Sequence, residues 1–242
     1  MKLLIIRHGD PDYTTDSLTE KGHREAQLLA GRIAPMPIAS YYVSPLGRAQ
    51  ATAAYTLAQC GRSAQTLDWL HEVGRNRIIG PDGQPRIAWD MLPADWTDVP
   101  SYYDKDRWTD VPVMAQADMA SGIAYVQNGL DALLGAHGYE RQGHCYRAVR
   151  PNEDTIALFC HFGVECVMLG HLLGISPMVL WHGFMAAPTS VTTAVTEERR
   201  EGCAYFRVTA FGDISHLYAN GEAPAFAGRF CETFDNPLQR HD

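Results

Sequence analysis

Uninterrupted apolar runs mark the buried strands of this chain. Residues 3–6 read Leu-Leu-Ile-Ile, and residues 155–160 read Thr-Ile-Ala-Leu-Phe-Cys. Short continuous apolar runs are typical of strands that are buried on both faces of a sheet. Further strands are expected at 41–43 and 66–70, with a late pair at 191–195 and 205–209.

Helical patterns alternate with these strands. Residues 18–33 repeat apolar side chains at i, i+3, i+4 and i+7 from Ala26 to Ile33, which places them on one helix face. Further helices are expected at 47–60, 114–134 and 164–173. Strands that alternate with helices predict parallel pairing. We therefore expect one α/β domain over residues 1–242, a three-layer αβα sandwich with a mostly parallel central sheet.

The alternation stops between residues 74 and 114. This stretch holds three tryptophans, two tyrosines, five prolines and seven aspartates, and neither periodicity continues through it. We expect an insertion or lid here rather than another strand–helix unit. Its aromatic residues fit local packing and a substrate cradle equally well. Its aspartates would repel a highly phosphorylated substrate, which favours a monophosphate with an apolar, aromatic or cationic organic part.

Composition narrows the class of partner. Of the 242 residues, 46% are hydrophobic, which is typical of a globular chain. A net charge of −8 argues against a general nucleic-acid or anionic membrane surface. We find no apolar window long enough to span a membrane, no signal-peptide layout and no C-x-x-C among the six cysteines. We expect a cytoplasmic protein with reduced thiols, and the sequence leaves a homodimer open.

Basic side chains follow three of the expected strands. Arg7 and His8 end the first run, and His161 ends the run at 155–160. Arg48 follows the strand at 41–43. The carboxyl ends of parallel strands meet at one edge of a sheet, where α/β proteins bind ligands. Four basic groups would repel one another there without an anion between them, and guanidinium groups match phosphate oxygens. The pattern predicts a pocket for a small phosphorylated molecule.

Ordered sequence blocks around these residues resemble the histidine phosphatase superfamily, whose fold is phosphoglycerate-mutase-like. The blocks are Arg7-His8-Gly9, Leu18-Thr19-x-x-Gly22-x-x-x-Ala26, Ser44-Pro45-x-x-Arg48-Ala49-x-x-Thr52-Ala53, Leu70-x-Glu72, His161 with Gly163, and a tail motif at Ser215-His216-Leu217. The resemblance implies a phosphomonoester hydrolase that needs no metal or other cofactor.

The resemblance also implies a role for each matching side chain. His8 would attack phosphorus and form a phosphohistidine. Glu72 would protonate the leaving alkoxide and then deprotonate the attacking water. Arg7, Arg48 and His161 would bind the phosphoryl oxygens and neutralise charge in the transition state.

Three further residues are candidates for phosphate binding. Thr14 stands where many members of the family carry an asparagine, and its hydroxyl is a weaker donor. Phe162 and Gly163 follow His161 at the start of an expected helix, a place that favours anions.

Several alternatives stay open. Residues 72–77 lack the Tyr-Gly and Leu-Gln-Gly sequence of phosphoglycerate mutases, which favours hydrolysis over mutase phosphotransfer. Asp10 is the alternative proton donor to Glu72. Asp10-x-Asp12-x-Thr14 also has the form of the magnesium-dependent haloacid-dehalogenase-type phosphatases, although Arg-His-Gly separates it from the strand. A phosphate-binding module without turnover is the remaining alternative. His137, His144 and Cys145 match no zinc-ligand spacing, and no metal site is expected.

Overall fold

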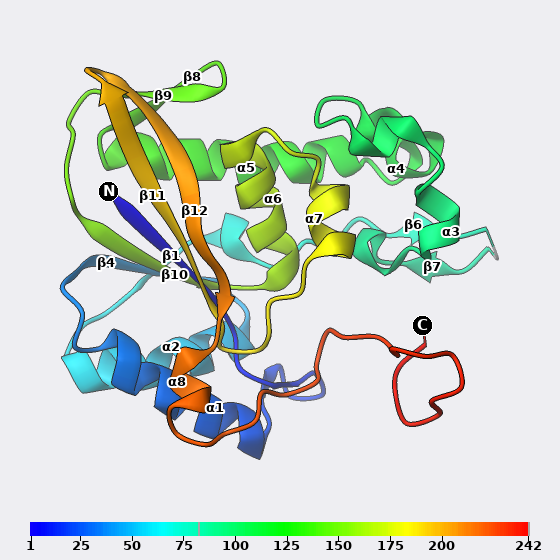
Figure 1. Ribbon diagram of the computed structural model, residues 1–242, viewed down its shortest axis with the longest axis horizontal. Helices are drawn as coiled ribbons and strands as arrows, with labels where there is room; N and C mark the ends of the chain where they lie inside the picture. The colour runs from blue at the N-terminus through cyan, green and yellow to red at the C-terminus, as the bar shows by residue number, and fades with distance from the viewer. Residues whose placement is uncertain (82, 242) are drawn as a thin grey trace.

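A mixed sheet between two layers of helices forms the frame of the molecule (Figure 1). The computed structural model describes residues 1–81 and 83–241. Along the sheet the strands follow the order β5-β4-β10-β1-β11-β12-β9-β8. The expected three-layer α/β class is confirmed.

The two halves of the sheet differ in strand direction. The parallel half contains β1 (Lys2–Arg7), β4 (Ile38–Val43), β5 (Gln65–Thr66) and β10 (Thr155–Cys160). The antiparallel half contains β8 (Tyr139–Gln142), β9 (Cys145–Ala148), β11 (Val191–Arg200) and β12 (Cys203–Asp213). The sheet is thus less parallel than we expected. The tight turn between β11 and β12 joins neighbouring strands, which forces them to run in opposite directions.

β1 is buried on both faces, as its apolar run predicts. Leu3 and Ile5 join the larger core cluster, and Leu4 and Ile6 join the smaller one. Successive side chains of a strand point to opposite faces, so a central strand must be apolar at every position. β10 is buried in the same way along Ile156 to Cys160.

One helical layer covers the smaller cluster. It contains α1 (Glu20–Ile33), α2 (Gly47–Cys60) and α8 (Ser215–Tyr218) (Figure 1). The helix expected at 18–33 begins two residues later, because Leu18 pairs with Pro11 in a small hairpin of β2 (Pro11–Asp12) and β3 (Ser17–Leu18). Thr19 then caps α1, its hydroxyl accepting a hydrogen bond from the Gly22 amide at 3.0 Å.

The opposite layer covers the larger cluster. It contains α4 (Pro112–Gln116), α5 (Met119–Ala136), α6 (Phe162–Leu173) and α7 (Pro177–Gly183). The helix expected at 114–134 is divided between α4 and α5, because Asp118 adopts a left-handed conformation with φ of 50°. The strand expected at 66–70 ends at Thr66 and gives way to the 3-10 helix η1 (Asp68–Leu70).

The stretch from 74 to 114 contains only short elements, as its irregular pattern predicts. These are β6 (Ile78–Ile79), β7 (Pro85–Arg86), η2 (Ala88–Asp90), α3 (Pro93–Trp96), η3 (Pro100–Tyr103) and η4 (Trp108–Asp110). Trp96, Tyr102 and Trp108 are buried in the larger core cluster, so these three rings serve packing. We refer to residues 74–114 as the insertion.

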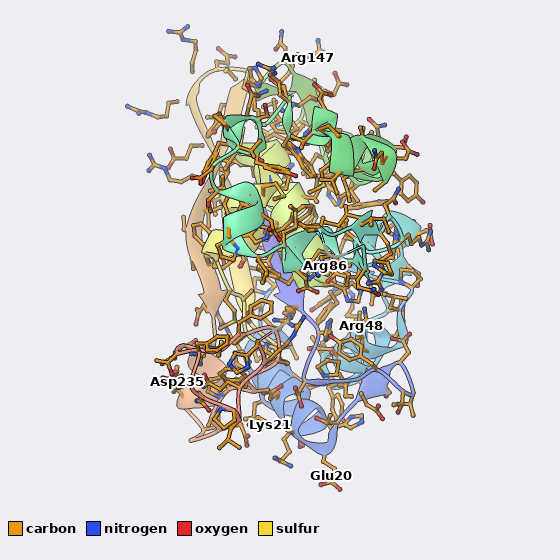
Figure 2. All side chains as sticks on the ribbon, turned by 90° about the vertical axis from the view of Figure 1, so that its right-hand side faces the viewer. Glu20, Lys21, Arg48, Arg86, Arg147 and Asp235 are labelled. Carbon is orange, nitrogen blue, oxygen red and sulfur yellow. The ribbon has the colours of Figure 1, made fainter. Side chains whose placement is uncertain are left out.

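The chain continues after α8 as an irregular tail, residues 219–241. It runs on the side of the molecule that carries β6, β7 and α3 (Figure 1). Figure 2 looks onto this side, with Arg86 of the insertion above, Asp235 of the tail below and Arg48 at a level between them. Among the helices of the described residues, none combines the length and the apolar sequence that a membrane crossing requires.

Candidate active site

The register of the parallel strands brings His8 and His161 together. β1 and β10 pair with Arg7 opposite Cys160, so the next residue of each strand is a histidine. The two imidazole centroids lie 5.0 Å apart, with their planes inclined by 58°. β4 lies on the other side of β10 and delivers Ser44, whose amide donates to the Phe159 carbonyl at 2.9 Å.

Hydrogen bonds fix the tautomer of His8. Its Nδ1 lies 2.7 Å from the Gly9 carbonyl, which can only accept, so Nδ1 carries the proton. Nε2 then has a lone pair, and the Arg48 Nε donates to it at 3.3 Å. Burial, followed by the charge of Arg7, lowers the pKa of His8 well below its ordinary value. The imidazole is therefore neutral at neutral pH, as a nucleophile requires.

The loop after β1 holds His8 rigidly. The Gly9 amide donates to the Thr52 hydroxyl at 2.9 Å, and the Thr189 amide donates to the His8 carbonyl at 3.1 Å. A Cβ atom at Gly9 would meet the Gly22 carbonyl oxygen at 2.8 Å. Only glycine fits this close approach of two backbones. Two positions of the family blocks, Gly9 and Gly22, thereby gain a physical explanation.

Arg7 is a buried cation held by backbone carbonyls. Its Nη1 donates to the Ala186 carbonyl and, at 3.4 Å, to the Ala227 carbonyl of the tail. Its Nε has no partner among the described residues. Burial lowers the pKa of Arg7, but guanidinium groups stay protonated in proteins. A buried cation of this kind favours an anionic group in the pocket.

Arg48 is oriented by a carboxylate that the sequence analysis did not single out. Its Nη1 donates to Asp16 at 2.6 Å, and the same carboxylate accepts the Gly47 amide at 2.7 Å. Asp16 therefore fixes both the first turn of α2 and the direction of the guanidinium. The Tyr13 ring lies over this guanidinium at 5.5 Å. The fork of Arg48 is held in the pocket next to His8.

His161 is fully buried and has one unpartnered nitrogen. Its Nε2 lies 2.7 Å from the Ser44 hydroxyl, while Nδ1 has no partner among the described residues. Burial, with the nearby His8 and the two arginines, lowers the pKa of His161 well below its ordinary value. The group expected to be a cation is thus neutral here. When the Ser44 hydroxyl donates to Nε2, Nδ1 carries the proton and is a donor for an incoming oxygen.

Glu72 occupies the N-terminus of α6. Its carboxylate accepts the Gly163 amide at 3.2 Å, the Val164 amide at 3.0 Å and its neighbour Val73 at 2.9 Å. We expected Gly163 to bind phosphate, but its amide binds this carboxylate instead. Burial raises the pKa of Glu72 above its ordinary value, against these hydrogen bonds and the charges of Arg48 and Arg7. A raised pKa suits a proton donor.

A second buried carboxyl lies close to this group. Glu165, in the first turn of α6, is 1% exposed, and its Oε1 has no partner among the described residues. Burial raises the pKa of Glu165 to about 7, although Thr192 and Arg7 oppose the shift. No sequence pattern distinguishes Glu165, because a glutamate in a first helical turn is ordinary.

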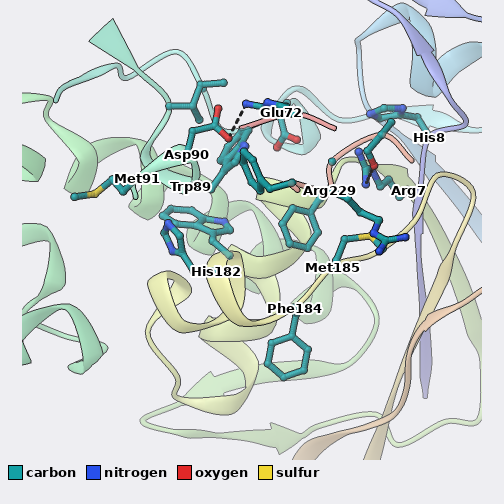
Figure 3. A pocket seen from close by; sticks show the side chains of 18 of the residues that line it. Arg7, His8, Glu72, Trp89, Asp90, Met91, His182, Phe184, Met185 and Arg229 are labelled. Carbon is teal, nitrogen blue, oxygen red and sulfur yellow. Dashed lines mark hydrogen bonds and ion pairs between the residues drawn. The ribbon is translucent and has the colours of Figure 1, made fainter. Parts of the chain in front are cut away.

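A cavity of about 1040 Å³ is lined by Arg7, His8, Arg48 and Glu72, whereas His161 and Glu165 lie behind its wall and are not among the lining residues. Arg7 and His8 line one end in the view of Figure 3, Trp89 and Met91 line the other, and Glu72 lies between them. The walls come from the strand-end loops, the start of the insertion, α7 and the tail. Phe162 also lines the cavity, with the Arg7 guanidinium 6.0 Å from its ring.

Thr14 and Asp10 do not lie among the lining residues. The Thr14 amide and hydroxyl both donate to Asp12, at 2.9 and 2.6 Å, so the predicted phosphate contact of Thr14 is not supported. Asp10 accepts the Thr19 hydroxyl at 2.8 Å beside α1, which leaves Glu72 as the pocket's candidate proton donor. Within the described residues, no three histidine, cysteine or acidic side chains gather as a metal site would require.

His216 of the tail motif lies behind the site. Its Nε2 is 3.1 Å from the Thr189 hydroxyl, and Thr189 donates its amide to the His8 carbonyl. Thr189 has a φ of 58°, a left-handed conformation that is rare for a branched residue. Burial lowers the pKa of His216 to about 4. The motif thus supports the backbone of His8 rather than lining the pocket.

The tail lines the pocket without any signal in the sequence. Gly228 packs so closely on Arg7 that a Cβ atom there would lie 2.9 Å from Nη1. Arg229, Phe230 and Arg240 line the same wall. Irregular segments with no periodic pattern cannot be placed against a site by sequence reasoning.

A family model matches the first part of the chain. Residues 3–107 match the model of the histidine phosphatase superfamily (branch 1). A comparison with curated proteins gives no match.

Solved structures share the fold. Phosphoserine phosphatase from Entamoeba histolytica, in complex with 3-phosphoglyceric acid, superposes with a TM-score of 0.60 at 19% identity, covering 89% of this chain and 98% of that one. Mycobacterial glucosyl-3-phosphoglycerate phosphatase gives 0.58 at 16%, covering 87% and 98%. Alpha-ribazole phosphatase from Shigella flexneri gives 0.56 at 19%, covering 88% and 97%. The first part of the chain, residues 3–107, is thus similar to the histidine phosphatase superfamily (branch 1), and the whole chain has the fold of these solved phosphatases.

Proposed function

We propose that the protein hydrolyses a small phosphomonoester without a metal ion, through a phosphohistidine on His8. One observation carries the proposal: a neutral His8, whose Nε2 lone pair accepts a hydrogen bond from Arg48, lines a pocket in which Arg7 and Arg48 supply positive charge. A nucleophile and fixed cations around one space are what attack on a phosphate dianion needs.

In the first step the His8 lone pair forms an N–P bond while the bond from phosphorus to the leaving oxygen breaks. The protonated carboxyl of Glu72 gives its proton to that oxygen. Arg7, Arg48 and the free Nδ1 of His161 hold the three equatorial oxygens as charge develops.

In the second step water attacks phosphorus and the P–N bond breaks, returning the lone pair to Nε2. The Glu72 carboxylate takes the proton from the water, and inorganic phosphate leaves. The three amides at Glu72 stabilise its ionised form during this half of the cycle.

The named neighbours support hydrolysis. The three solved proteins with this fold are phosphatases for phosphoserine, glucosyl-3-phosphoglycerate and alpha-ribazole phosphate, respectively. At these low sequence identities, the structural similarity shows a shared fold but not a shared substrate. The residues after Glu72 also lack the mutase sequence, which agrees with water as the acceptor.

Chelator-treated protein, assayed on sugar phosphates, phosphoglycerates, nucleotides and phosphoamino acids, tests this proposal. We expect turnover that a chelator does not reduce, and rapid-quench labelling from a 32P substrate at a single histidine, labile in acid and stable in base.

Other outcomes identify the alternatives. Turnover that requires magnesium, with label on Asp10, would assign a haloacid-dehalogenase-type reaction. Transfer to a phosphoglycerate in preference to water would assign a mutase. Absence of both turnover and label across the panel would leave a binding module.

A further inference from the structure

The pocket carries more positive charge than one phosphate needs. Six arginines line it against two carboxylates, although the whole chain has a net charge of −8. The lining arginines are Arg7, Arg48, Arg75, Arg77, Arg229 and Arg240. Of the described aspartates in the insertion, Asp90 is the one that lines the cavity. The pocket therefore does not favour the cationic substrate that the aspartate count suggested.

The arginines outside the phosphate site are not equally engaged. Arg229 pairs with Glu232 at 2.6 Å, and Arg240 pairs with Asp90 at 3.3 Å. Arg75 lies 3.9 Å from Asp68, the limit of an ion pair, with 65% of its side chain exposed.

Arg77 differs from the others. In the described ranges 1–81 and 83–241, no hydrogen bond or ion pair joins its guanidinium. Arg75 and Arg77 lie at the start of the insertion, directly after Glu72. An unengaged cation beside a weakly engaged one, on the wall of a cavity, has the donors that a carboxylate or phosphate oxygen accepts.

An apolar surface lines the cavity together with these arginines. Ile87, Trp89 and Met91 come from the insertion, and Trp181 comes from α7. The ring centroids of Trp89 and Trp181 lie 6.1 Å apart, with the ring planes inclined by 57°. The cavity volume of about 1040 Å³ is slightly above the range of about 300–1000 Å³ for sites that bury drug-sized ligands. A phosphate group fills a small part of it.

We propose that the substrate is a phosphomonoester with an apolar or aromatic body and a second anionic group, and that Arg77, assisted by Arg75, binds this second group. The inference rests on the proposed function of the same pocket. Discrimination comes from the insertion, while the reacting phosphate stays with the strand-end residues.

Matched aryl phosphates test the proposal. The two compounds of a pair share the same aromatic body, and one carries a carboxylate where the other carries a neutral carboxamide. Pairs are made with one aromatic ring and with two. A bisphosphate of each length shows whether the second group is preferred as a carboxylate or as a phosphate. The readout is the ratio of kcat/KM for the charged and the neutral compound. We expect a ratio of about 10 or more at low salt, falling as salt screens the pair.

Variants of the full chain locate the effect. Arg77→Gln and the double variant Arg75→Gln, Arg77→Gln should bring the ratio close to one, while turnover of the neutral compounds stays within a few-fold. Arg77→Lys should retain part of the preference. Arg107→Gln is the matched control, an exposed arginine of the insertion outside the lining, and should keep the full ratio.

A wild-type ratio near one at both lengths, or a ratio that survives the double variant, overturns the inference. Failure of the proposed function has a different signature, because the neutral aryl phosphates would then give neither turnover nor phosphohistidine.

Discussion

The two sides of the pocket are built in different ways. On the strand-end side, Arg7, His8 and His161 are at most 6% exposed and are held by backbone atoms or buried hydroxyls. On the outer side, exposed arginines of the insertion and the tail form ion pairs at the surface. Buried hydrogen bonds fix geometry strongly, whereas exposed ion pairs contribute about 0–1 kcal/mol. Under the proposed function, the strand-end side carries out the reaction and the outer side selects the substrate.

Removing the nucleophile should give the largest effect. His8→Ala should lower kcat for any phosphomonoester by at least ~10⁴-fold, because His8 is the lining imidazole whose Nε2 lies against the Arg48 guanidinium. Steady-state kinetics and 32P labelling measure this. His144→Ala, an exposed histidine, is the control and should keep full activity and label. A His8→Ala protein that retains a tenth of the activity would remove the reaction from the strand-end side.

Removing the proton donor should give an effect that depends on the leaving group. Glu72→Gln should lower kcat/KM for alkyl phosphates by about 10²–10⁴-fold, since an alkoxide cannot leave unprotonated. An activated aryl phosphate should still phosphorylate the enzyme, giving a burst of phenol before a slow steady state. Asp10→Asn should show no such dependence. If Asp10→Asn and not Glu72→Gln selectively loses alkyl phosphates, the assignment of the acid is wrong.

The buried carboxyl of Glu165 should appear in the pH dependence of stability. Its pKa is about 7 in the fold against an ordinary 4.5, so between these values the folded state binds more protons than the unfolded state. Stability from this group is therefore full below pH 4.5 and is lost as pH rises through 7. The difference is on the order of 3 kcal/mol.

Glu165→Gln keeps the shape without the charge. Urea unfolding at pH 5 and pH 8 measures the free energy of unfolding, and the variant should become more stable relative to the wild type at pH 8 than at pH 5. Glu20→Gln, at an exposed helix start, is the control and should leave the difference in unfolding free energy between pH 5 and pH 8 unchanged. An equal response of Glu165→Gln and wild type at both pH values would mean that the carboxyl is as solvated as the outer arginines.

The contact between tail and insertion should give the smallest effect. A double-mutant cycle of Asp90→Asn and Arg240→Gln should yield a coupling free energy below ~1 kcal/mol, because the arginine is 44% exposed. Urea unfolding measures it. A coupling of several kcal/mol would show that the outer side is fixed as firmly as the strand-end side.

The same contrast separates what the sequence could predict from what it could not. Arg7, His8 and His161 end apolar runs, so strand geometry alone brings them to one edge. Glu72 was found through its motif, but its partners Gly163 and Val164 lie some ninety residues away and follow from no local pattern. Thr14 lies outside the lining, and its amide and hydroxyl donate to Asp12, a local hydrogen bond that residue type alone does not predict.

The outer wall was the least predictable part. The tail has no periodicity, and the aspartates of the insertion could be counted but not placed relative to the cavity. Fold class was accessible because continuous apolar runs and helical faces are local signals. The antiparallel half of the sheet was underestimated: the late strands were expected at 191–195 and 205–209, but β11 and β12 continue to Arg200 and Asp213. The four-residue strands β8 and β9 are too short to show a clear period.

The burial of β1 on both faces has a consequence for how its alignment is specified. A strand with one apolar face resists slippage, since a shift of one residue would expose that face. The apolar run from Leu3 to Ile6 does not resist such a shift, because both faces of the strand are buried and the side chains on each face are equally hydrophobic. The register of β1 is instead specified at its polar end, where the His8 amide donates to the Cys160 carbonyl and the Gly9 amide donates to the Thr52 hydroxyl. The residues proposed for the reaction would thereby also set the register of the central strand of the sheet.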